Sequence, residues 1–212
     1  MYKGYGRKYC EVAGYGVVAE PRCRIMNSYI VILISGQVCR TLTLMPVSNS
    51  SPLIHLSRLG KLGYARELFS SVTIPPTVRA ETIERGKSDG YGDALALERL
   101  ESDGWLRTSE LLPRSKKVAM ELSDVVGVGE AEAIALALEK KERLFMDDLK
   151  GRRTAELYRL ETTTTLGIML ELLAKRAVTW LDYKKNVKIY GSQGWISGEI
   201  IQEFIEKGKE LE

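Results

Sequence analysis

The stretch MPVSNSSPLI, from Met45 to Ile54, carries the first indication of the fold. A short apolar run ends in the polar residues from Asn49 to Ser51, and Pro52 follows where a helix can begin. Proline is favoured in the first turn of a helix, so the stretch predicts a strand that runs directly into a helix. In parallel α/β sheets, ligands bind where strands give way to helices. The polar end of this strand is therefore the first candidate for a functional site.

Short β-type runs alternate with amphipathic helices from Met45 to the C-terminus. The expected later strands are SVTIP, WLRTSELL, RLFMDD and ETTTT. Helices are expected from Pro52 to about Phe69, over TVRAETIERG with an end at Gly86, up to about Glu101, over EAEAIALALEKK, LKGRRTAELYRL and GIMLELLAKRA, and from about Gly198 to Leu211 with Ser197 as N-cap. Residues Lys184 to Ser192 are expected to be irregular. This alternation predicts an α/β protein whose parallel sheet has helices on both faces.

The composition indicates an ordinary globular protein. Of 212 residues, 44% are hydrophobic and 28% are charged, which suits a soluble chain with a real core. The formal net charge of +3 is too small to indicate a nucleic-acid or membrane binder by itself. The residues before Met45 carry a net charge of +4 and the rest of the chain −1, so the domain that follows is close to neutral.

The first 44 residues have two possible interpretations. They can form a small β appendage, because YIVILIS and VCRTLTL flank Gly36 and Gln37, where a glycine suits a type II′ hairpin turn. Alternatively, translation starts at Met45 and the preceding residues come from a start codon assigned too far upstream. Under either interpretation, we expect the main domain to span residues 45–212.

The cysteines and the apolar segments indicate a cytoplasmic protein. Cys10, Cys23 and Cys39 match no zinc or redox motif, and an odd number suits free thiols in a reducing compartment. The apolar run from Tyr29 to Ile34 is far shorter than the roughly 20 residues that span a bilayer. The N-terminus also lacks the order of regions found in a signal peptide. We therefore expect no membrane partner.

Acidic and amide side chains follow several of the predicted strands. Asn49 ends the first strand, Glu81 lies in the helix after the second, Glu130 opens a helix, and Asp147 and Asp148 end the fourth strand. In a parallel sheet these groups meet at one edge. Neighbouring carboxylates repel one another, and a hard divalent cation such as Mg²⁺ or Mn²⁺ offsets that repulsion. Such an ion activates water and polarises phosphoryl oxygens, so phosphodiester hydrolysis is the leading chemistry.

Each acid also has a structural explanation when taken singly. Glu130 and Glu132 suit the first turn of a helix because the helix dipole favours negative charge there. Glu132 lies about 200° around the helix from Glu130, so the two cannot share a face. The pair Asp147 and Asp148 can simply mark the entry to a helix, and Glu81 can be a solvated helix residue.

The basic run after the aspartates and the single histidine need separate interpretations. Lys150, Arg152 and Arg153 can hold a phosphate beside a metal ion, or form salt bridges on the surface. His55 falls among helix residues without a partner of the metal-ligand type, so a structural or surface role is expected.

Five segments together resemble a known family. VSNSSPLI, IPPTVRAETI, GVGEAEAIALALE, RLFMDDLKGRR and TTTTLGIMLELLAKR occur in the order and at about the spacing of the PIN domain. The chain resembles in particular a prokaryotic, often archaeal, PIN-like subfamily of unknown function related to the VapC-type toxin ribonucleases. The resemblance covers about Met45 to Glu212. It implies a three-layer α/β/α sandwich with a central parallel sheet, Mg²⁺ or Mn²⁺ as cofactor, cleavage of single-stranded RNA, a homodimer, and a small antitoxin protein as partner.

The resemblance also implies which residues form the site. By position, the catalytic acidic sites fall on Asn49, Glu81, Glu130 and Asp148. The expected metal ligands are Glu81, Glu130, Asp148 and Asp147. Ser51 is expected to line the site, and RNA is expected to bind to Ser51 and to the basic residues Lys150, Arg152 and Arg153.

Asn49 stands where active PIN nucleases usually carry aspartate, so weaker metal binding is expected. Two functions therefore stay open. One is a metal-dependent ribonuclease that acts as the toxin of a toxin–antitoxin pair. The other is a catalytically weak or inactive PIN-fold module that binds RNA or a protein partner, using its C-terminal amphipathic helix.

Overall fold

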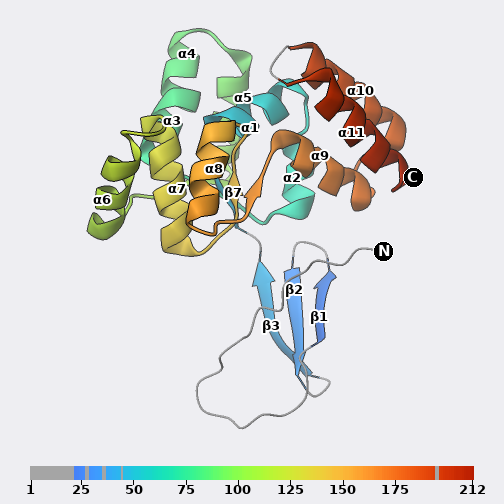
Figure 1. Cartoon of the computed structure of the whole chain (residues 1–212), viewed down its shortest axis with the longest axis horizontal. Coiled ribbons are helices and arrows are strands. Elements are labelled where there is room, and N and C mark those ends of the chain that lie inside the picture. Colours follow the sequence, from blue (N-terminus) through green and yellow to red (C-terminus); the bar gives the residue numbers. More distant parts are fainter. Residues whose placement is uncertain (1–21, 27–28, 35–36, 44, 194–195) are drawn as a thin grey trace.

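The computed structural model describes residues 22–26, 29–34, 37–43, 45–193 and 196–212 (Figure 1). Before Met45, strands β1 (Arg22–Met26), β2 (Tyr29–Ile34) and β3 (Gln37–Thr43) form an antiparallel sheet. Ile34 pairs with Gln37, so Gln37 belongs to β3 and not to the predicted turn. Gly36, the other residue of that turn, lies outside the described residues.

A second, five-stranded sheet organises the chain after Met45. Its strands are β4 (Val47–Ser48), β5 (Val72–Ile74), β6 (Leu106–Thr108), β7 (Leu144–Phe145) and β8 (Thr162–Thr163). All are parallel, in the order β6-β5-β4-β7-β8. The order reverses between β4 and β7, which makes their carboxyl ends the topological switch point where parallel sheets bind ligands.

Helices cover both faces of this sheet, which confirms the predicted α/β/α sandwich (Figure 1). One core lies between the sheet and helices α6, α7 and α8, and it includes Val47, Ile134 and Leu144. The other core lies on the opposite face and includes Leu53, Phe145 and Tyr183. The helices are α1 (Ser50–Arg58), α2 (Leu62–Leu68), α3 (Pro76–Arg79), η1 (Ala80–Arg85), α4 (Gly86–Ser88), α5 (Gly92–Ser102), α6 (Pro113–Leu122), α7 (Val128–Lys140), α8 (Leu149–Leu157), α9 (Thr165–Ala174), α10 (Trp180–Ser192) and α11 (Gly198–Lys209).

Two helix boundaries differ from the sequence-based expectation. The single helix expected from Pro52 to Phe69 is in fact α1 and α2, separated at Gly60, whose φ of 65° a glycine adopts without strain. The helix expected to stop at Gly86 continues to Ser88. In addition, the sequence did not predict helix α6.

The expectation of irregular structure from Lys184 to Ser192 is wrong. These residues belong to α10, which buries Tyr183, Val187 and Tyr190 on one face. The three residues have helical spacing, but the lysines between them lower the mean hydropathy of the segment and conceal the periodicity.

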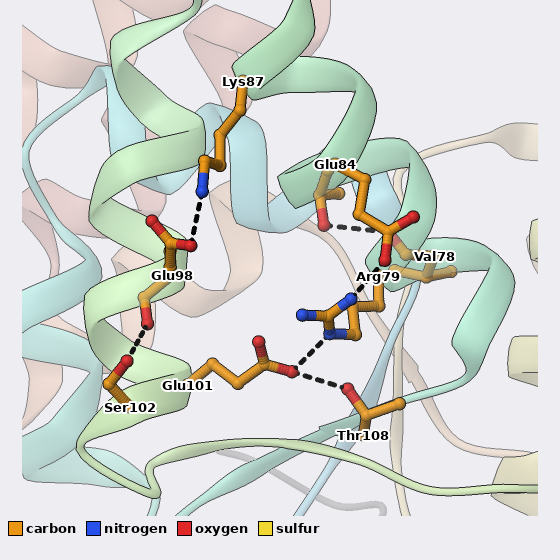
Figure 2. A network of polar contacts seen from close by, with 9 residues as sticks. Val78, Arg79, Glu84, Lys87, Glu98, Glu101, Ser102 and Thr108 are labelled. Carbon is orange, nitrogen blue, oxygen red and sulfur yellow. Dashed lines mark hydrogen bonds and ion pairs between the residues drawn. The ribbon is translucent and has the colours of Figure 1, made fainter.

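The helical segment after β5 contains a π-helical turn, η1, which follows α3 without a break. A polar network ties this segment to α5 and β6 (Figure 2). The Nε–H of Arg79 donates to Glu101 at 2.7 Å, and the hydroxyl of Thr108 donates to the same oxygen at 2.9 Å. The hydrogen bond from Arg79 lowers the pKa of Glu101. A second ion pair, between Lys87 and Glu98 at 2.6 Å, joins α4 to α5. The network fixes the backbone that carries Glu81.

The last two helices pack against each other beside α9 (Figure 1). Ser197 is the N-cap of α11, as predicted, and accepts from the amide of Ile200. The hydroxyl of Tyr183 donates to the carbonyl of Phe204 at 2.8 Å, and Phe204 packs on the core. Ile201, Phe204 and Ile205, which belong to the apolar face considered above as a surface for a partner, thus pack on the core of the same chain, whereas Ile200 is exposed.

None of the helices among the described residues is both long and apolar enough to cross a membrane.

Candidate active site at the carboxyl edge of the sheet

Asn49 lies at the switch point, directly after β4. Its backbone amide donates to the carbonyl of Phe145 in β7 at 3.1 Å, and its own extended backbone starts α1. The side chain is 3% exposed, and its Oδ1 has no hydrogen-bond partner among the described residues. A buried carbonyl oxygen without a partner is costly, so this atom is suited to accept from a water molecule or to ligate a cation.

The two aspartates after β7 face different parts of the molecule. Leu144 and Met146 belong to the core under α7, whereas Phe145 belongs to the opposite core. Successive side chains of a strand point to opposite faces. The same alternation continues into Asp147 and Asp148, which therefore meet different neighbours.

Asp147 is held by buried groups on the α1 and α9 side. Its Oδ2 lies 2.8 Å from Nδ1 of His55 and accepts from the hydroxyl of Thr165 at 2.7 Å. Its Oδ1 accepts from the amide of Thr165 at 2.7 Å. The ring of His55 meets that of Tyr190 edge to face at 5.1 Å. Burial raises the pKa of Tyr190, with a smaller contribution from the charge of Asp147. Both carboxylate oxygens of Asp147 are thus engaged, and His55 has the acidic partner that the sequence did not reveal.

Asp148 begins α8 and is exposed. Its Oδ1 accepts from the amide of Gly151 at 2.7 Å, which is the N-cap hydrogen bond of the helix. A carboxylate has acceptor capacity beyond this one bond, so Asp148 can cap the helix and serve as a ligand together.

Glu130 lies at the start of α7, and the charges of two other acids affect its pKa. Its Oε2 accepts from the amide of Gly127 at 3.3 Å. Burial raises the pKa of Glu130, and the charges of Asp148 and, more weakly, Glu81 raise it further, while Lys150 lowers it. The carboxylate of Glu130 in α7 therefore lies within electrostatic reach of Asp148, at the start of α8, and of Glu81, in η1. Burial is the largest cause of the raised pKa of Glu130, and the amide of Gly127 and the charge of Lys150 offset it only in part.

Glu81 rests against the first turn of α7. A Cβ added at Gly129 would lie 3.1 Å from both of its carboxylate oxygens, so the absence of a side chain at Gly129 makes room for Glu81. The hydroxyl of Ser50 donates to its Oε2 at 2.5 Å. The predicted hydroxyl was that of Ser51; Ser51 is half-buried at the start of α1, and it is the neighbouring Ser50 that reaches the acid.

Glu132 has a structural role, as its helical position suggested. Its Oε2 accepts from the amide of Thr77 at 3.2 Å, near the start of α3. Pro75 offers no side-chain cap there, so Glu132 supplies one from a neighbouring helix. This acid is directed away from Glu130 and takes no part in the site.

A family model, DUF3368, described as a PIN domain, matches residues 45–210. The chain belongs to the PIN domain family. No curated protein matches it.

The acids of this PIN domain have the oxygen chemistry that hard cations prefer. PIN domains generally use divalent metal ions. In the part of the chain that the structure describes, no three Asp, Glu, His or Cys side chains lie close enough together to hold a metal ion as they stand. Glu81, Glu130, Asp148 and the unpartnered Oδ1 of Asn49 nevertheless supply oxygen donors of the kind that a hard cation such as Mg²⁺ or Mn²⁺ prefers.

The three basic residues after the aspartates are placed differently. Lys150 is exposed, and its charge acts on Glu130. Arg153 is exposed on the next turn of α8. Arg152 is half-buried, its Nε has no partner among the described residues, and its charge acts on Tyr190. Of the three, Lys150 is therefore the best placed to meet a phosphate beside the acids.

Proposed function

We propose that the protein is a metal-dependent endoribonuclease that hydrolyses phosphodiester bonds in single-stranded RNA with Mg²⁺ or Mn²⁺. The observation that carries the proposal is the buried Oδ1 of Asn49, which lies at the switch point of the sheet and has no hydrogen-bond partner among the described residues. The carboxylate of Glu130 lies within electrostatic reach of Asp148 and Glu81, and Asp148 follows a strand whose carboxyl end is at the switch point, where such folds bind ligands. Membership of the PIN family supports the same chemistry.

Glu81, Glu130 and Asp148 would hold the cation, with Asn49 as an additional oxygen donor. A divalent cation bound there supplies a Lewis acid for a phosphoryl oxygen and lowers the pKa of water. The chain's own residues position these ligands: the hydroxyl of Ser50 orients Glu81, and the amide of Gly151 orients Asp148. Lys150 offers a cation to the phosphate that enters.

Asp147 has a positioning role in this proposal, in place of the ligand role suggested by the sequence. Its two oxygens are occupied by His55 and Thr165. These bonds hold the turn between β7 and α8, and so fix the backbone from which Asp148 extends.

We further propose that the protein acts as the toxin of a toxin–antitoxin pair, as a homodimer in the cytoplasm. The support is the resemblance to the VapC-type toxins within the PIN family. The test is co-expression with the product of any small open reading frame immediately upstream, and the proposal requires that this product bind the protein and suppress its cleavage of RNA.

A second candidate function is a PIN-fold module that binds RNA or a protein without cutting. The observation that favours it is Asn49, because an amide in place of aspartate leaves the site with one negative charge fewer. The carboxylates also do not form a ready metal site without rearrangement.

One experiment separates the two functions. Unstructured and structured RNAs are incubated with the full-length protein in Mg²⁺, Mn²⁺ or EDTA, alongside Asp148→Asn and Asn49→Asp. The ribonuclease proposal predicts cleavage that requires metal and is lost in Asp148→Asn. Glu132→Gln is the matched control, since Glu132 lies on the other face of α7. Absence of cleavage by both the folded wild type and Asn49→Asp would favour the binding module.

A further inference from the structure

A small groove opens beside Glu81 on the side away from α7. It lies between α1, the η1–α4 segment and the start of α5, and its volume is about 110 Å³. This is far below the size of a pocket for a whole small molecule, and suits one planar or phosphate-sized group. The lining residues that matter here are Arg58, Glu81, Arg85, Asp89, Tyr91 and Asp93. We call it the Glu81 groove.

Tyr91 gives the Glu81 groove an exposed aromatic ring. The residue is 53% exposed at the N-cap of α5, and the guanidinium of Arg58 lies 6.0 Å from the centroid of its ring. An exposed tyrosine beside an arginine contributes nothing to the core. Single-stranded nucleic acids are held by such platforms, because every base has a face that stacks on an aromatic ring or a guanidinium.

The charges of the groove leave one arginine available. The Nε of Arg58 lies 3.3 Å from Oδ2 of Asp93, so these two charges offset each other. Glu81 accepts from Ser50 and belongs to the acidic site. Arg85 is exposed and has no hydrogen-bond or ion-pair partner among the described residues, although it lines the groove. A planar guanidinium in this state is suited to a phosphate, which it can bind through two parallel hydrogen bonds.

The carboxylate of Asp89 makes the Glu81 groove more suitable for a nucleotide than for a free phosphate ion. This exposed carboxylate lines the same groove and repels a bare anion. A nucleotide instead brings N–H donors on its base, which a carboxylate can accept. The combination of a ring, an unpaired guanidinium and an acceptor therefore fits a nucleotide better than an inorganic ion.

We infer that the Glu81 groove is a substrate subsite that binds one unpaired nucleotide of a single-stranded RNA, next to the phosphodiester at the acidic site. Tyr91 stacks on the base, and Arg85 binds a flanking phosphate. A base inside a duplex has no free face, so the subsite selects single strands. The inference rests on the proposed function.

Binding of RNA by full-length protein carrying Asp148→Asn tests the subsite without cleavage. The affinity for a labelled unstructured RNA is measured by fluorescence anisotropy over a range of salt concentrations. In this background, Tyr91→Ala is expected to weaken binding about 5- to 150-fold, the range found for the loss of one stacked base. Tyr91→Phe should restore it. Arg85→Gln should reduce the slope of log affinity against log salt by about 0.7, as expected for one lost phosphate contact to a single strand.

Two controls and a modified RNA identify the contact. Tyr158→Ala and Arg99→Gln remove an exposed tyrosine and an exposed arginine outside the groove. Both should leave RNA affinity unchanged. RNAs that lack the base at one position in turn should reveal a position where binding weakens, and Tyr91→Ala should abolish the sensitivity to that position. Affinities for Tyr91→Ala and Arg85→Gln within twofold of these controls would overturn the inference.

The outcome for the subsite is distinguishable from the outcome for the proposed function. If the wild type never cleaves RNA but binding still depends on Tyr91 and Arg85, the ribonuclease proposal fails and the subsite stands. If the wild type cleaves RNA but binding is indifferent to both residues, the subsite fails and the ribonuclease proposal stands.

Discussion

Asp147 and Asp148 are adjacent in the chain, yet the pleat of β7 gives them different partners. Asp147 is enclosed by His55 and Thr165, whereas Asp148 is exposed and caps α8. The same charge therefore supports the structure at one position and is available for chemistry at the next.

The two aspartates should differ in how strongly the same substitution changes the stability of the protein. Asp147→Asn replaces a carboxylate oxygen by a donor facing Thr165, so we expect a loss of about 1–3 kcal/mol in the free energy of unfolding. Asp148→Asn should change this free energy by less than about 0.5 kcal/mol, because asparagine is an equally good N-cap. Urea denaturation in EDTA measures both. An equal effect of the two substitutions would show that the partners do not differ in this way.

Glu130 should make the metal-free protein less stable as the pH rises. Its raised pKa means that the folded state holds this proton more tightly than the unfolded chain, whose value is near 4.5. The favourable contribution is complete below that value and is lost as the pH passes through the raised folded pKa. Glu130→Gln stays neutral and can still accept from Gly127.

The melting temperature in EDTA, measured at several pH values, tests this prediction. Glu130→Gln should melt above the wild type near pH 7, and the difference should vanish near pH 4. A difference that does not change with pH would mean that the effect is not caused by ionisation of Glu130.

The sequence predicted the elements that carry Glu81, Glu130 and Asp148, but not the contacts that Asp147 and Ser50 make. Glu81, Glu130 and Asp148 could be located because each follows a strand or opens a helix. The bonds of Asp147 to His55 and Thr165 join residues far apart in the chain, and no local pattern reveals such a contact. Which serine reaches Glu81 depends on how α1 is rotated about its axis, because the rotation decides whether Ser50 or Ser51 faces the acid. The end of a strand in the sequence does not determine this rotation.

At the scale of elements, the first turn of α7 is the surface on which the acids meet. Glu81 packs against Gly129, Glu130 belongs to the turn itself, and both carboxylates lie near the positive end of the helix dipole. Arg79, the last residue of α3, donates to Glu101 of α5 (Figure 2). This contact ties α5 to the helical segment that continues into η1, which carries Glu81.

Gly129→Ala should separate metal binding from stability. The new Cβ would lie 3.1 Å from the Glu81 oxygens, so the carboxylate must shift by a few tenths of an ångström. Alanine favours a helix by up to about 1 kcal/mol, so the variant should be as stable as the wild type or more stable. Its affinity for Mn²⁺ should fall. Calorimetry and denaturation measure the two quantities.

Gly63→Ala is the control for this substitution, because nothing lies within 4 Å of a Cβ at that position of α2. If Gly129→Ala binds Mn²⁺ as tightly as Gly63→Ala, Glu81 does not need its present position to act as a ligand.

The sequence predicted the alternation of elements, because apolar strands and helix caps are local signals. Ser197 as N-cap and the strand before Asp147 are examples. The prediction from the sequence failed for α10, where tertiary packing determines the secondary structure. α10 is helical although polar residues dominate its surface, since Tyr183, Val187 and Tyr190 are buried together against α9 and α11.

At the scale of the whole molecule, two cores on opposite faces of the sheet hold the site between them. The core under α7 and α8 supports Glu130 and Asp148, and the other core supports His55 and Asp147. The pair α10 and α11 extends the second core at the C-terminal end of the chain (Figure 1).

Gly208→Ala tests whether α11 is part of this core. A Cβ at Gly208 would overlap the ring of Tyr183 and approach Trp180 to 2.9 Å. Overpacking of this kind costs about 1–3 kcal/mol, despite the higher helix propensity of alanine. Gly198→Ala, in the same helix but with open space around its Cβ, should cause no loss. Equal stability of the two variants in denaturation experiments would mean that α11 does not pack as described.

The central claim is that Glu81, Glu130 and Asp148 form one cation site, and titration of Mn²⁺ by calorimetry tests it most directly. The titration uses the wild type, Glu81→Gln, Glu130→Gln, Asp148→Asn and the control Glu132→Gln. We predict one site in the wild type and in Glu132→Gln, with strong loss of affinity in each of the other three. Equal Mn²⁺ affinity in all five proteins would contradict the assignment.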